Sequence, residues 1–149
     1  MSKAKSADLI LKLYELRREE KMREARNWMI TFFPESAQDI TQTMMNDETS
    51  AYYRMVTSYW DMAASFVNHG AINEKMFNEV SGEAVMVFSR IEPFLEEIRG
   101  MNGSPNYLAN LEKLIMRMPD AKEMLAKRRE MMKRMMQARN EAAAKSVTT

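Results

Sequence analysis

The chain has 149 residues and a mass of 17.4 kDa, which is the size of one domain. It contains no cysteine and one histidine, His69, which excludes disulfides, thiolate metal sites, a cysteine nucleophile and a cluster of histidine metal ligands. Four glycines and four prolines exclude a collagen-like or Gly-rich chain, whereas seventeen methionines far exceed ordinary usage.

The net charge of +1 is unevenly distributed along the chain. Residues 1–33 carry 8 basic and 5 acidic side chains, residues 34–116 carry 5 and 12, and residues 117–149 carry 9 and 4. Because the basic ends are amphipathic, we expect them to pack against an acidic body in the same chain or in a neighbour. The alternative is a basic tail that binds an acidic partner.

A long N-terminal helix is predicted over about residues 6–33. Ser6 is a suitable N-cap, Asp8 lies in the first turn, and Pro34 ends the segment. Apolar side chains follow at steps of three or four residues, which is the spacing of one helix face. Such a helix is about 40 Å long, so we expect part of it to project or to pair with another chain.

A core bundle is predicted over about residues 36–117. Its first helices cover about 36–45 and 48–68; the second has a broad apolar face, is expected to be the most buried element, and ends at Gly70. Asn73 caps the next helix, which Gly82 either divides or bends. Pro93 kinks the following apolar run or starts a new helix over 94–99, and Ser104-Pro105 precedes a helix over 106–117.

The last helix, over about residues 121–145, is rich in methionine and in basic side chains. Met124, Arg128, Met131, Met135, Ala138 and Ala142 follow at alternating steps of four and three, and Met132 and Met136 widen the stripe. Methionine fills irregular gaps and basic stems cover apolar surface, so the stripe is interpreted as a helix–helix interface within the bundle or between protomers. The stripe has three other interpretations: it binds nucleic acid, an anionic membrane surface, or a soft metal such as Cu(I). The candidate interaction residues are Met124, Arg128, Met131, Met132, Met135 and Met136.

No segment alternates with the period of a strand, and no repeat of domain-array length is present. The sequence therefore predicts one all-α domain over residues 1–149. This domain is a bundle of six or seven helices with a long N-terminal helix and a long Met-rich C-terminal helix.

Residues typical of catalysis are sparse. His69 lies at a predicted helix end, where its ring is expected to meet the last carbonyls. The pairs Glu79/Glu83 and Glu92/Glu96 have the spacing of one helix face, but the Glu-x-x-His motif of a two-metal helical site is missing. Since the motifs of nucleotide, hydrolase and zinc sites are also missing, we predict no catalytic residue, no cofactor and no metal.

One stretch resembles a known family. The pattern consists of an apolar helix ending in Gly, an Ile-Asn-Glu helix start, a Pro-Phe-x-x-x-x-Arg run and an apolar-Glu-x-Leu end. It is found in the segments Phe66–Phe77, Phe88–Arg99, Ser104-Pro105 and Tyr107–Leu114. This pattern resembles a bacterial and phage family of small helical proteins classed as a domain of unknown function, over about residues 50–116. Phe88 lies near a position where the family often has Trp. The resemblance implies a helical fold and adds nothing about function, because the family has no assigned activity.

Together these features predict a non-enzymatic helical interaction or scaffold protein. It is expected to form a homo-oligomer, most simply a two-fold dimer, or to bind a protein partner through its terminal helices. The alternative is a small nucleic-acid-binding protein that uses the basic C-terminal helix. With no signal-peptide pattern, no integral membrane segment and no cysteine, a cytoplasmic location is expected.

Overall fold

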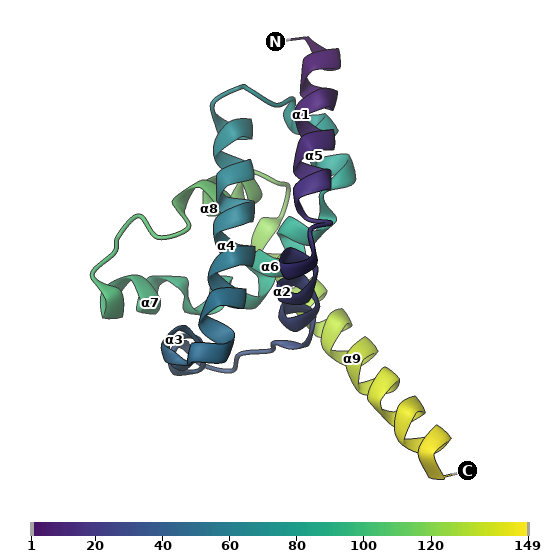
Figure 1. Cartoon of the computed structure of the whole chain (residues 1–149). Coiled ribbons are helices and arrows are strands. Elements are labelled where there is room, and N and C mark those ends of the chain that lie inside the picture. Colours follow the sequence, from purple (N-terminus) through teal and green to yellow (C-terminus); the bar gives the residue numbers. More distant parts are fainter. Residues whose placement is uncertain (1, 149) are drawn as a thin grey trace.

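The structure is a computed structural model that describes residues 2–148, and within this range all regular elements are helices (Figure 1). The all-α prediction is confirmed, but nine α-helices and one 3-10 helix are present in these residues rather than six or seven. The elements are α1 (Lys3–Leu16), α2 (Glu20–Thr31), α3 (Ala37–Met45), α4 (Asp47–Asn68), α5 (Glu74–Val80), α6 (Gly82–Ile91), the 3-10 helix η1 (Glu92–Phe94), α7 (Leu95–Asn102), α8 (Ala109–Met116) and α9 (Ala121–Thr148).

The prediction of a single N-terminal helix over residues 6–33 is wrong, because the chain breaks between α1 and α2. The carboxylate of Glu19 accepts hydrogen bonds from the backbone N–H groups of Lys21 and Met22 and so caps a new helix. The start also differs from expectation: Ser2 caps α1, whereas Ser6 is buried inside it and accepts a hydrogen bond from the backbone N–H of Asn73.

Two further breaks lie inside the expected core helices. Ser81 separates α5 from α6 just before Gly82, and Pro93 lies in the short 3-10 helix that connects α6 to α7. Helix α8 begins at Ala109, later than expected, because the buried Leu108 adopts a left-handed backbone conformation with φ of 54°.

The end of α4 follows the prediction closely. Gly70 has a φ of 80°, and the N–H groups of Gly70 and Ala71 donate to the carbonyls of Val67 and Phe66. This is the Schellman ending that a glycine after a helix favours.

The most completely buried helix is α6 rather than α4. All eight residues from Ala84 to Ile91 are buried, whereas α4 buries eight of its 22 residues along one face. In Figure 1, α6 lies in the interior, between α4 and α9. The hydrophobic core includes side chains from each of the nine α-helices, so α6 is enclosed by the rest of the described chain.

One carboxylate connects three helices beside α6. Glu83 accepts two hydrogen bonds from Arg26 Nε and Nη2 at 2.9 Å and one from Trp60 Nε1 at 3.2 Å. Arg26 comes from α2 and Trp60 from α4, so Glu83 holds both helices against the start of α6. The side chain of Glu83 is 14% exposed, which makes the ion pair stronger than a surface pair.

Replacing Glu83 with alanine is therefore expected to lower the free energy of unfolding by about 2–3 kcal/mol, because Arg26 and Trp60 keep buried donors without an acceptor. Urea denaturation measures this change. Glu79→Ala removes an exposed glutamate from α5 and is the control, with an expected change within about 0.5 kcal/mol. Equal effects of the two substitutions would contradict the role of Glu83.

Candidate functional site

The first third of α9 packs on the body of the same chain. Ala121 and Leu125 are buried, and Met124 is half-buried against the core. Arg129 Nη1 donates to the carbonyl of Ser89 at 2.8 Å and lies 3.4 Å from a carboxylate oxygen of Glu92. The main contacts of α9 with the body are with α6 and α8.

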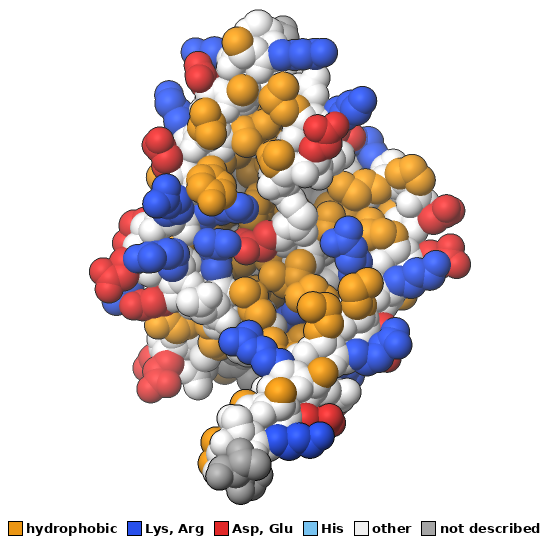
Figure 2. Space-filling view, turned by 90° about the vertical axis from the view of Figure 1, so that its right-hand side faces the viewer, with side chains coloured by type: hydrophobic (Ala, Val, Ile, Leu, Met, Phe, Trp, Pro, Cys, Tyr) orange, Lys and Arg blue, Asp and Glu red, His pale blue; other side chains and the backbone are white. Residues whose placement is uncertain are grey.

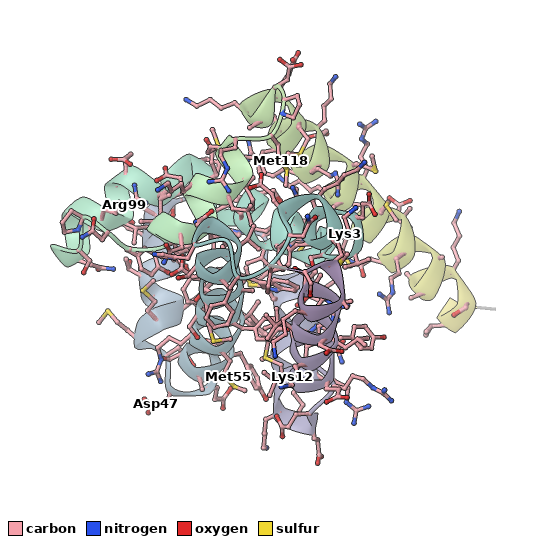
Figure 3. All side chains as sticks on the ribbon, turned by 90° about the horizontal axis from the view of Figure 1, so that it is seen from above. Lys3, Lys12, Asp47, Met55, Arg99 and Met118 are labelled. Carbon is pink, nitrogen blue, oxygen red and sulfur yellow. The ribbon has the colours of Figure 1, made fainter. Side chains whose placement is uncertain are left out.

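The remainder of α9 projects away from the body (Figures 1 and 3). Met131 is 53% exposed and Met135 is 62% exposed, whereas Met132 and Met136 are half-buried. Arg128 is exposed as well. The structure thus divides the six predicted interaction residues: Met124 and Met132 pack against the core, Arg128, Met131 and Met135 face solvent, and Met136 is half-buried without joining the core.

A second surface feature is an apolar groove of about 310 Å³ between α1, α4 and α5. Trp60 and Phe77 lie at its base, and the guanidinium of Arg17 lies 4.7 Å from the ring centre of Tyr14 and 5.7 Å from that of Trp60. Figure 2 shows apolar side chains gathered over the upper part of this face, where α1 lies. The sequence did not predict this groove, whose lining includes Arg17, the residue directly after the end of α1 at Leu16.

The phenol groups of the buried tyrosines stay protonated at neutral pH, so none of them acts as a general base there. Tyr59, which lines the groove, donates to the carbonyl of Leu13, and burial raises the pKa of Tyr59 to about 12. Tyr53 and Tyr107 share a hydrogen bond of 2.7 Å between their hydroxyls. Burial raises the pKa of Tyr107 to about 12 and that of Tyr53 well above its ordinary value.

The histidine and the acidic pairs have structural partners. His69 is exposed, and its Nδ1 lies 2.8 Å from the carbonyl of Ser65, which is the capping contact expected at the end of α4. Glu79 and Glu83 lie on different helices, so they do not share the single helix face that their spacing predicted. Glu74 pairs with Arg117 at 2.7 Å. Residues 2–148 contain no group of three acidic or histidine side chains suited to a metal ion.

Arg90 is the feature that sequence reasoning missed most clearly. It lies in the buried helix α6 and is 2% exposed, and no acidic side chain of the described residues pairs with it. Its Nη1 donates to the carbonyls of Met29, Ile30 and Phe32 at 3.1, 3.1 and 2.7 Å, where α2 ends. The only signal in the sequence was a charged residue at the end of a run that is otherwise apolar on nearly all sides.

A family profile described as "Domain of unknown function (DUF4760)" matches residues 3–118. The match covers α1 to α8 and ends before α9, which starts at Ala121. It extends well beyond residues 50–116, over which the sequence resembled such a family. Comparison with curated proteins and with solved structures found no match to the chain. No helix of residues 2–148 is both long enough and apolar enough to cross a bilayer.

The division of α9 predicts unequal costs for two truncations of apolar side chains. Leu125→Ala is expected to lower the free energy of unfolding by about 2–4 kcal/mol, because Leu125 is fully buried. Met135→Ala is expected to change it by less than about 0.5 kcal/mol in dilute protein, because its side chain is mostly exposed. Urea denaturation of both variants tests this, and a costly Met135→Ala would mean that α9 lies flat on the body.

Stability is expected to fall at alkaline pH as the buried phenols ionise. The pKa of Tyr59 rises from 10.0 to about 12 on folding, so its contribution is complete below pH 10 and is lost as the pH rises through 12. In urea denaturation at pH 9 and pH 11, Tyr59→Phe should therefore lose less stability between the two values than the unchanged chain. An identical loss in both would contradict the assignment.

Proposed function

The chain belongs to the DUF4760 family, and we propose that it is a non-enzymatic helical interaction protein that self-associates through the exposed face of α9. We call this face the α9 seam, and its members are the exposed residues Arg128, Met131, Met135, Ala138 and Ala142. The observation that carries the proposal is that Met131 and Met135 are more than half exposed on a helix that extends past the body.

The spacing of the α9 seam supports a second α-helix as its occupant. Steps of four and three average 3.5 residues, which is the repeat that keeps one stripe facing a partner helix along its length. The seam runs from Arg128 to Ala142, about 21 Å of helix. The projecting part of α9 has little tertiary support, and helices of this length are marginal in water on their own. Pairing with another helix supplies the burial that the body does not.

The charges that flank the α9 seam support a second copy of this chain in antiparallel order. A parallel pair would bring Arg134 of one copy close to Arg139 of the other, so like charges would face each other. An antiparallel pair with Arg134 nearest the two-fold axis instead brings Lys127 of one copy opposite Glu141 of the other, in both directions. These two attractive pairs outnumber the single like-charged contact, which is between the two copies of Arg134 at the axis. Such a pair has two-fold symmetry, which closes the assembly as a dimer.

The proposal is tested by the solution mass of the full-length protein, measured by light scattering on a sizing column over a concentration series. The unchanged chain is expected to approach twice its mass of 17.4 kDa. Met131→Glu and Met135→Glu each place a charge in the α9 seam and are expected to return the mass to that of one chain. Met45→Glu is the matched control, because Met45 is 82% exposed on α3, and it should leave the mass unchanged.

A dimer whose mass is unchanged by both seam substitutions would contradict the proposal. A monomer at every concentration would do the same and would favour the second candidate function, which is nucleic-acid binding. That alternative is supported by the exposed basic side chains Lys127, Arg128, Arg134 and Arg139 along α9. Adding duplex DNA or RNA to the same experiment separates the two functions, because such binding weakens steeply as salt rises.

A further inference from the structure

A small cavity of about 200 Å³ lies between α9, the segment that follows α2 and the end of α6. Phe33 and Pro34 form one wall, and Arg90, Arg129 and Lys133 bring three cationic side chains to its lining. Glu130 is the one acidic side chain in the lining. The cavity is therefore positively charged, and the exposed Glu130 and Lys133 mark its open side on α9.

The deepest of these cations, Arg90, uses only part of its hydrogen-bonding capacity within the chain. Its Nη1 donates to three carbonyls at the end of α2, and the ring of Phe33 covers the guanidinium face at 3.9 Å. Its Nε and Nη2 are buried, and no acceptor among residues 2–148 contacts them. Buried donors without an acceptor are costly and uncommon, so these two require an explanation.

Arg26 shows how the Nε and Nη2 atoms of a guanidinium are used elsewhere in the same protein. Its Nε and Nη2 both donate to the carboxylate of Glu83, at 2.9 Å each. That edge presents two parallel N–H groups, which match the two oxygens of a carboxylate or a phosphate. In Arg90 the equivalent edge has no partner from the chain, and the side chain lines a cavity that two other cations share.

We propose that this cavity is a binding site for a small oxyanion, namely a phosphate group, which accepts both hydrogen bonds from the Nε/Nη2 edge of Arg90. Lys133 and Arg129 complete the site by facing the remaining oxygens. A dianionic phosphate matches this excess of cations better than a monoanionic carboxylate does. Arg129 already contacts Glu92 at 3.4 Å, so Lys133 supplies the positive charge that no acidic side chain of the described residues neutralises.

The Arg90 side chain stays charged when such a ligand approaches at neutral pH. Burial lowers the pKa of Arg90 to about 10, and a bound anion would raise that pKa again. The site is independent of the α9 seam, because Met131 and Met135 do not line the cavity. The phosphate site and the proposed dimer can therefore fail or succeed separately.

The test is a titration of the full-length, ¹⁵N-labelled protein with inorganic phosphate in about 0.15 M sodium chloride, which screens diffuse attraction. The readout is the Nε–H signal of Arg90, identified by its absence from the spectrum of Arg90→Lys. We expect this signal to shift and to saturate, and the Nε–H signal of Arg26 to stay in place because Glu83 already holds it. Sodium acetate should shift the Arg90 signal less than phosphate at equal concentration.

Lys133→Glu tests the site without risk to the fold, because Lys133 is exposed. It should weaken phosphate binding at least about tenfold, the effect of losing a charged contact of about 1.4 kcal/mol. Arg134→Glu makes the same charge change at the next position, outside the cavity, and should alter the affinity less than about twofold. An Arg90 signal that does not move, a shift that never saturates, or equal affinities of the two variants would overturn the proposal.

A vesicle experiment separates the two sources of a phosphate group. Cosedimentation with phosphatidylcholine vesicles that contain phosphatidic acid, lost in Lys133→Glu and kept in Arg134→Glu, would assign the site to a lipid headgroup. Saturable binding of inorganic phosphate without cosedimentation would assign it to a free phosphate compound. Absence of both would overturn the site.

Discussion

The enclosure of α6 is the constraint on which the rest of the structure depends. Eight successive residues of this helix are buried, so it needs neighbours on every side rather than along one stripe. Helices α4 and α8 cover part of it, and α9 covers another part. The short connections around it, Ser81 before and η1 after, follow from the need to turn the chain at both ends of a helix that lies inside the core.

Two arginines show how the fold accommodates charge around α6. Arg26 meets the carboxylate of Glu83 at the start of the helix, and the pair also gives Trp60 an acceptor. Arg90, near the end of the helix, meets the last carbonyls of α2 instead, whose partial negative charge favours a cation. Both contacts bind α2 to α6, but only the first pairs charge with charge. The second leaves one edge of a buried guanidinium without an acceptor among the described residues.

Features that depend on neighbouring residues were predictable from the sequence, and features that depend on distant ones were not. The cap at Gly70 and the start of α5 at Asn73 follow from local backbone preferences, and the structure has both. The break at Arg17–Glu19 escaped prediction because the apolar stripe continues in phase across it. Arg90 escaped prediction because its partners Met29 and Phe32 lie about sixty residues earlier in the chain. The apolar stripe of α9 was visible, but which methionines face the body depends on how α9 meets α6.

The geometry of α9 relates the two surfaces proposed here. Arg129 and Lys133 are four residues apart and share one face of the helix, and Met131 and Met135 share another. Each methionine follows one of these cations by two residues, a rotation of about 200°, so the two faces are opposite. A phosphate group held between Arg90 and the inner face of α9 would add a charged contact at the place where the helix leaves the body. That contact would fix the direction in which the outer face, with its exposed methionines, is presented to a second helix.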